Sequence, residues 1–143
     1  MPYEFLEEAA IADIAFQATG NSVEEVFLAA ADATMQVMID NLESIEFKDR
    51  RTLHLENGAL DMLLFDLLQE LIYYKDANQL LLRVRSLQVR QENNSWKLVG
   101  EALGEKLDPD RHRQRADVKA VTLHHFHLGK TDAGWAASVI LDI

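Results

Sequence analysis

The sequence predicts an α+β fold, built as a two-layer domain of mainly antiparallel sheet with two main helices. Short extended segments come first, two segments of helical periodicity lie among them, and the remaining chain alternates in the manner of β-hairpins. This order fits an antiparallel sheet, whereas regularly alternating strands and helices would indicate βαβ units. The 143 residues are enough for one domain with its own core, which we place at residues 1–143.

Two short strands and a helix are predicted at the start of the chain. Residues 3–6 and 13–18 have extended character, and a Gly-Asn turn signal follows them. Ser22 stands three residues before Glu25, which is the spacing of a capping box, so a helix is expected to begin there. Its apolar residues recur at helical spacing until about Asp40.

The rest of the chain predicts one more strand, a second helix and two hairpins. Polar and apolar residues alternate over residues 51–56, as in a half-buried strand. From Leu60 to about Asn78 leucines recur at helical spacing in a very apolar segment, so this helix is expected to be largely buried. The two hairpins are predicted from residues 80–90 with 96–107, and from residues 118–128 with 135–143.

Composition argues against several classes of function. The chain carries 24 Asp and Glu against 14 Lys and Arg, a net charge of -10, and such a surface repels a nucleic-acid backbone. The absence of cysteine excludes disulfides and Cys-ligated zinc or iron–sulfur clusters. The first residues are acidic where a signal peptide would be basic, and no apolar run reaches the ~18 residues of a membrane span. We therefore expect a cytoplasmic protein that does not bind a membrane.

The sequence contains none of the common enzyme signatures, such as a phosphate-binding loop or a nucleophile elbow, but it has a cluster of histidines. On a strand, alternation would put His125 and His127 on one face and His124 on the other. Two imidazoles at this spacing can share a metal ion, but no third ligand is visible nearby. Ordinary histidines on a strand surface give the same pattern, and this structural interpretation is favoured.

A short basic run lies between the two predicted hairpins. Residues 111–115 read Arg-His-Arg-Gln-Arg, the only dense group of basic residues in the chain. Guanidinium groups bind phosphates and carboxylates through two parallel hydrogen bonds, so the run could grip a phosphate or an acidic partner. A solvated loop that balances nearby acids is also consistent with it, because short charge runs carry little specificity by themselves.

Asp142 and Ile143 close the sequence after an apolar strand, which is expected to hold this end in place. The Asp142 side chain and the carboxylate of Ile143 would then lie within a few ångström of each other. Close carboxylates repel, so either one takes up a proton or a cation lies between them, and hard divalent ions favour such oxygen ligands. Asp13, at the start of an early strand, is a candidate for a third oxygen ligand.

Short segments spread along the chain carry a resemblance to a known family. In order they are Tyr3-Glu4-Phe5, Ala12-Asp13-Ile14 leading to Gly20, Glu24-Glu25-Val26-Phe27 with Ala29-Ala30, Asp66-Leu67-Leu68-Gln69-Glu70-Leu71, Gly104-Glu105, Asp108-Pro109-Asp110-Arg111-His112, Asp117-Val118-Lys119-Ala120-Val121-Thr122-Leu123-His124, and Ile140-Leu141-Asp142-Ile143. Their order and spacing matter more than any one of them. Through these segments the chain resembles the archease family, small activators of RtcB-type RNA ligases, over essentially its whole length.

This resemblance implies an α+β domain that is not itself an enzyme. It would promote the guanylylation and turnover of an RtcB-type RNA ligase in tRNA splicing or RNA repair, and it would contact RNA only through that ligase. The resemblance also implies a divalent-cation site, for calcium in the first place, made by Asp13, Asp142 and Ile143. Lys119 and His112 lie in matching segments, and we expect them to contact the partner or to take part in activation.

The sequence departs from the family pattern beside Asp13. Ala10-Ile11 stands where the family usually has His-Thr, so a polar contact that would orient Asp13 is expected to be missing.

Two other functions stay open for this chain besides the activation of a ligase. A chaperone-like module for RNA-processing proteins is compatible with a small acidic domain. A metal-dependent hydrolase using Asp13, Asp142 and the histidine cluster is less favoured, because such enzymes need more converging ligands.

Overall fold

The computed structural model describes residues 2–6 and 13–143 and contains two long helices and seven strands. The elements are β1 (Tyr3–Leu6), β2 (Asp13–Gly20), α1 (Val23–Met38), a 3-10 turn η1 (Leu42–Ser44), β3 (Asp49–Asn57), α2 (Leu60–Asn78), β4 (Leu80–Glu92), β5 (Ser95–Lys106), β6 (Ala120–Thr131) and β7 (Gly134–Asp142). The predicted strands and helices are therefore all present, with small shifts at their ends. Within the described residues, neither long helix is both long and apolar enough to cross a membrane.

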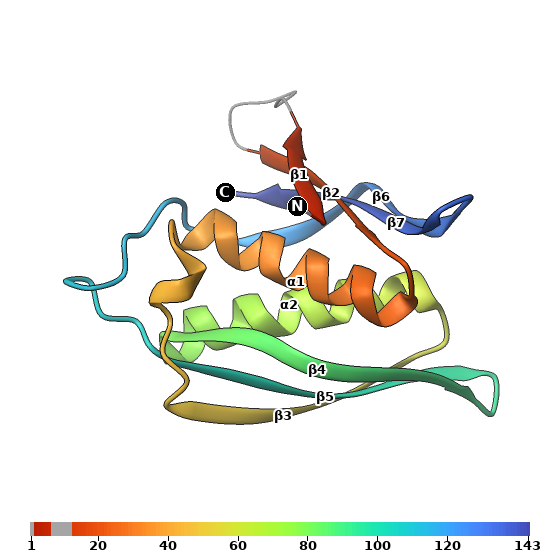
Figure 1. The fold of residues 1–143 in the computed structure, drawn as a ribbon, viewed down its shortest axis with the longest axis horizontal. Coiled ribbons are helices and arrows are strands. Elements are labelled where there is room, and N and C mark those ends of the chain that lie inside the picture. The colour runs from red at the N-terminus through yellow and green to blue at the C-terminus, as the bar shows by residue number, and fades with distance from the viewer. Residues whose placement is uncertain (1, 7–12) are drawn as a thin grey trace.

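The seven strands form two antiparallel sheets rather than one. The first sheet has the order β1-β2-β7-β6, and the second has the order β3-β5-β4. Both helices lie between the sheets (Figure 1), where α1 packs on β2 and β4 while α2 packs on β4 and β6. The predicted α+β class and the two helices are confirmed. Two layers were predicted from the sequence; the second sheet adds a third layer on the other side of the helices.

Helix α1 begins where the capping box predicts. The Ser22 hydroxyl accepts a hydrogen bond from the Glu25 backbone N–H at 3.1 Å, and the Glu25 carboxylate accepts one from the Asn21 N–H at 3.2 Å. The first contact satisfies an N–H group that the first turn of a helix leaves without a partner, and the second ties the residue before the cap to the helix. Because sheets cover it on two sides, α1 buries most of its length: Val26, Phe27, Ala29, Ala30, Ala31, Ala33, Thr34, Met35, Val37 and Met38.

Helix α2 is held mainly by its leucines. Its first turn has no side-chain cap, and its end is marked by Gln79 in the left-handed region (φ 54°). The Gln79 N–H donates back to the Tyr74 carbonyl, which closes the last turn. The buried residues of α2 form one continuous stripe, and Lys75 stands at its end: Leu63, Leu64, Leu67, Leu68, Leu71, Ile72 and Lys75.

Candidate functional site: carboxylates at the ends of β2 and β7

The register between β2 and β7 brings two carboxylates together. Asp13, the first residue of β2, lies directly opposite Asp142, the last residue of β7. On the inner face of the same pair, Phe16 lies opposite Val139, and both are buried against the helices. A slip of one residue would turn these apolar side chains outward, so the core fixes the register. Since Asp13 is an odd number of positions from Phe16, its side chain and that of Asp142 project from the outer face.

The two carboxylates form a like-charge pair at the edge of the core. Residues directly opposite in an antiparallel pair have Cβ atoms about 4.5–5.5 Å apart, and like charges at this separation destabilise the sheet. Both residues are half-buried. Among residues 2–6 and 13–143, none of the ion pairs involves Asp13 or Asp142. The described part of the chain therefore supplies no cation to this pair.

Two further predicted residues lie beside the pair. The Lys119 backbone N–H donates to the Asp142 carbonyl at 2.8 Å, and the Lys119 side chain is exposed. Ile143 is half-buried and packs against the core, so the end of β7 is held in place as the sequence analysis expected. The structure thus brings Asp13, Asp142, Ile143 and Lys119 to one end of the four-stranded sheet, where β2 begins and β7 ends.

Helix α2 contacts the segment that carries Lys119 at two points, which the sequence analysis missed. Lys75 Nζ donates to Asp117 Oδ1 at 2.7 Å, and Gln69 Oε1 accepts a hydrogen bond from the Val121 N–H at 2.8 Å. One signal was present in the sequence, because Lys75 continues a helical stripe that otherwise consists of leucine and isoleucine. A lysine in such a position requires a partner for its ammonium group.

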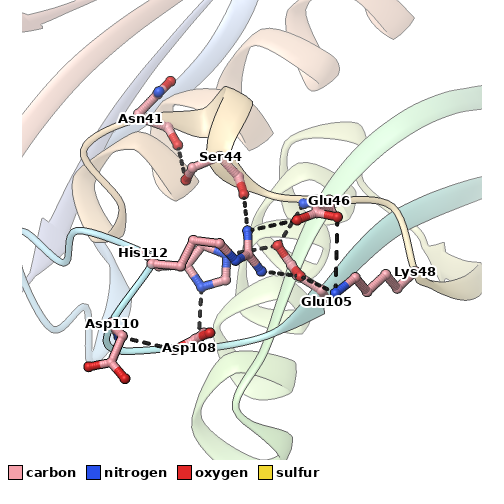
Figure 2. A network of polar contacts seen from close by, with 9 residues as sticks. Asn41, Ser44, Glu46, Lys48, Glu105, Asp108, Asp110 and His112 are labelled. Atoms are coloured by element: carbon pink, nitrogen blue, oxygen red, sulfur yellow. Dashed lines mark hydrogen bonds and ion pairs between the residues drawn. The ribbon is translucent and has the colours of Figure 1, made fainter.

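His112 lies elsewhere and is only 1 % exposed, which does not fit direct contact with a partner. Its Nδ1 accepts a hydrogen bond from the Asp108 N–H at 2.8 Å, so Nε2 carries the proton and donates to Glu105 Oε2 at 2.8 Å. Figure 2 shows His112 between Asp108 and Glu105, with Glu46 and Lys48 on the far side of Glu105. The structure therefore gives His112 a role inside the loop that follows β5.

Glu105 is the centre of this second group of contacts. It is 3 % exposed and accepts hydrogen bonds from His112, from Arg111 and from the Glu46 backbone N–H, the last at 2.7 Å. Burial by itself raises the pKa of Glu105, but these hydrogen bonds outweigh it and lower the pKa to about 2 from an ordinary value of 4.5. Glu105 is therefore a stable anion that ties the loop and the segment after η1 to β5.

The arginines at both ends of the basic run, residues 111–115, bind groups of the protein itself. Arg111 binds Glu105 and the Ser44 carbonyl, and Arg115 Nη1 donates to the Gln36 carbonyl at 3.1 Å. Arg113 has a largely exposed side chain, 4.0 Å from Asp40. Of the two interpretations that the sequence left open, the loop that balances nearby acids fits this geometry.

The histidine cluster lies in an irregular part of β6. The register with β7 breaks between Thr122 and His127, and His125 has a positive φ of 54°. His125 and His127 line the same cavity of about 320 Å³ on the outer face of the sheet. The His124 and His125 rings lie 4.0 Å apart, so strict alternation does not hold across this bulge. Over residues 2–6 and 13–143, no three His, Cys, Asp or Glu side chains form a group that could hold a metal.

Comparison with known proteins identifies the family. The Archease protein family (MTH1598/TM1083) matches residues 3–143. The chain belongs to the archease family. Protein archease of Methanosarcina barkeri is 38% identical over 142 residues, which covers 99% of this chain and 95% of that protein. Protein archease of Pyrococcus abyssi is 35% identical over 133 residues, covering 92% and 93%.

Solved structures agree with the archease fold. The solution structure of Methanobacterium thermoautotrophicum protein 1598 superposes with a TM-score of 0.84 at 32% identity, covering 99% of both chains. The crystal structure of a Thermotoga maritima archease has a TM-score of 0.64 at 16% identity and covers 96% of both chains, which shows the shared fold alone. That protein is described as a possible chaperone. Ala10 and Ile11, where this archease sequence departs from the expected pattern, lie outside the described residues.

Proposed function

We propose that this protein is an accessory activator of an RtcB-type RNA ligase. It would promote guanylylation and turnover of the ligase during tRNA splicing or RNA repair in the cytoplasm, without being an enzyme itself. Membership of the archease family supports this proposal. The observation that carries it is the register of Asp13 opposite Asp142, beside Lys119, because it leaves two carboxylates together without a cation from the described chain.

The Asp13–Asp142 pair fits a hard divalent cation. Two carboxylates that face each other repel, and calcium prefers several oxygen ligands at 2.3–2.6 Å in a flexible arrangement. In this proposal Asp13, Asp142 and the carboxylate of Ile143 hold the ion, with calcium as the expected one. The bound ion would offset the repulsion and fix the end of β7. Residues of the chain would thereby present a cation-bearing surface with the ammonium group of Lys119 beside it.

Activation would work by a shift of population. The protein can favour the reactive state of the ligase only if it binds that state more tightly than the stalled one. Its net charge of -10 would steer it toward a positively charged ligase surface, so added salt should weaken the association. The ligase would supply the nucleophile, and RNA would meet this protein only through the ligase.

The central experiment measures ligase guanylylation and calcium binding with the same variants. Asp142→Ala should reduce calcium affinity by more than about a hundredfold, because loss of a direct ligand exceeds the 10- to 100-fold loss seen for outer contacts. Activation should be lost with it. Asp132→Ala is the matched control, since Asp132 is an exposed carboxylate in the hairpin at the far end of β7. Calorimetric titration with calcium and an assay of guanylylated ligase provide the two measurements.

A second arm of this experiment tests Ile143. Two residues appended after Ile143 convert its carboxylate into an amide, so calcium binding and activation should fall, whereas the same residues added before Met1 should change neither. Full activation by Asp142→Ala or by the extended chain would contradict the metal-dependent proposal. Unchanged ligase turnover over a range of wild-type concentrations would contradict activation altogether.

A chaperone-like module is the second candidate. It is favoured by the description of the Thermotoga maritima archease as a possible chaperone. Suppression of aggregation of unrelated proteins, equally by the wild type and by Asp142→Ala, would support it over specific activation. A metal-dependent hydrolase is less well supported, since the described residues hold no group of three or more metal-binding side chains.

A further inference from the structure

Helix α2 contacts the chain at two points on either side of Lys119, one just before β6 and one within it. Lys75 bonds to Asp117, two residues before Lys119, and Gln69 bonds to Val121, two residues after it. Between these contacts the chain makes its hydrogen bond from the Lys119 N–H to the Asp142 carbonyl. The segment is therefore fixed on both sides of the residue whose backbone bonds to Asp142.

The contact from Lys75 is a buried one on the side of the helix. The Lys75 side chain is 11 % exposed, whereas that of Asp117 is 70 % exposed. The hydrogen bond and the charge of Lys75, with a smaller contribution from the charge of Lys119, lower the pKa of Asp117. A buried ammonium group needs such a partner, since an unpaired one is strongly unfavourable. Lys75 therefore holds Asp117 in one place rather than forming an optional surface pair.

The contact from Gln69 satisfies a backbone N–H group of an edge strand. β6 is at the edge of the four-stranded sheet and pairs only with β7 on one side. The Val121 N–H points away from that pairing and donates to the Gln69 side chain at 2.8 Å. An edge N–H withdrawn from water without such an acceptor would be costly. Val118 and Val121 are both buried, so the backbone between them has little freedom.

We propose that Lys75 and Gln69 are positioning residues for the candidate site. They hold residues 117–121 so that the Lys119 backbone keeps its hydrogen bond to the Asp142 carbonyl, next to the Asp13–Asp142 pair. Neither residue touches the pair itself. For its effect on ligase activation, this inference rests on the proposed function; its effect on the local backbone does not.

Amide hydrogen exchange tests the inference without any ligase. Lys75→Met and Gln69→Met keep the length of the side chains and remove the hydrogen bonds. One lost hydrogen bond is worth about 0.5–1.5 kcal/mol, so the Lys119 and Val121 amides should exchange up to about tenfold faster. Amides in α1 should exchange at the wild-type rate. Gln88→Met, an exposed position on β4 in the other sheet, is the matched control.

Three further variants separate positioning from general destabilisation. Gln69→Glu keeps an acceptor oxygen for the Val121 N–H and should restore slow exchange. Asp117→Asn removes the charge of the same pair from its exposed side and leaves Asp76, at 3.9 Å, as the charged partner of the Lys75 ammonium, so it should speed exchange at Lys119 as Lys75→Met does. The double variant of Lys75→Met with Asp117→Asn should be no faster than either single variant, because both remove one interaction.

The ligase assay gives the functional consequence. Lys75→Met and Gln69→Met should raise the concentration needed for half-maximal activation by up to about tenfold, and Gln69→Glu should restore the wild-type value. Wild-type exchange at Lys119 in Lys75→Met, Asp117→Asn and Gln69→Met would overturn the inference. Faster exchange at Lys119 together with inactive wild-type protein would instead sustain the positioning of Lys119 and contradict the proposed activation of the ligase.

Discussion

Glu105, which is buried, and the Asp13–Asp142 pair, which is half-buried, differ in the partners that the fold gives to their carboxylates. Glu105 receives hydrogen bonds from Arg111, His112 and a backbone N–H, and its pKa falls to about 2. Asp13 and Asp142 face each other across a pair of strands, and neither is in an ion pair within the described residues. One anion is balanced from inside the fold, while the other two are left facing each other.

The difference indicates where a ligand is needed. A buried charge whose hydrogen bonds all come from the protein itself stabilises its surroundings and needs no ligand. A pair of like charges without a cation reduces stability, and an added cation would offset the repulsion. The contacts of Glu105 give it a structural role, whereas a binding role for the Asp13–Asp142 pair belongs to the proposed function.

Removing the charge of Glu105 should produce the largest loss of stability. Glu105→Gln removes the buried anion of the group and leaves Arg111 paired with Glu46, at 3.2 Å, and breaking a buried charged network costs about 3 kcal/mol. Urea denaturation at pH 7 measures this loss of free energy of unfolding. Glu101→Gln is the matched control on the same strand, because its partner Arg50 is exposed and surface pairs are worth at most about 1 kcal/mol. Equal effects of the two variants would show that the Glu105 network has no special weight.

Acid should lower the free energy of unfolding through protonation of Glu105. The pKa of Glu105 is about 2 in the folded protein and ordinarily 4.5, so the folded state binds its proton less readily than the unfolded chain. Its stabilisation is therefore complete above about pH 5 and is lost as the pH falls toward 2, with about 2 kcal/mol lost between pH 7 and pH 3. Asp117, whose pKa is also lowered, contributes in the same direction.

Urea denaturation at pH 7 and at pH 3 checks this dependence. In Glu105→Gln, the difference in free energy of unfolding between the two pH values should be smaller by about 2 kcal/mol, because Gln does not titrate in this range. The same pH dependence in the variant and in the wild type would show that other carboxylates control acid stability.

Much of the fold could be predicted from local patterns. Ser22 and Glu25 mark the start of α1, and alternating apolar residues mark the strands, because these signals depend only on near neighbours. Asp13 could be named as a candidate to meet Asp142, and the family resemblance pointed the same way, but the strand patterns alone do not predict that β2 pairs with β7. Whether the strands form one sheet or two could not be predicted, since periodicity identifies the buried face of a strand and not its partner.

Long-range contacts account for what the sequence did not reveal. Glu105 bonds to the backbone of Glu46, a residue 59 positions away, and nothing near either residue in the sequence predicts that meeting. The same holds for Lys75 with Asp117, which are 42 positions apart. The bulge in β6 depends on a positive φ at His125, and a histidine gives no signal of that conformation as a glycine would. His112 was expected to contact a partner because it lies in a segment that resembles the family, and that resemblance gave no sign of its burial.

Removing one charge of the Asp13–Asp142 pair should give the smallest effect, and one of opposite sign. Asp13→Asn in the presence of a chelator should stabilise the protein by about 0.5 kcal/mol, because like charges directly opposite in a sheet are destabilising by about 0.2–1 kcal/mol. Asp132→Asn, in the exposed hairpin beyond β6, removes the same charge without a facing carboxylate and should change little. Urea denaturation with replicate curves resolves this difference. A loss of stability in Asp13→Asn would mean that the fold already supplies a partner to Asp13, and the contrast with Glu105 would then disappear.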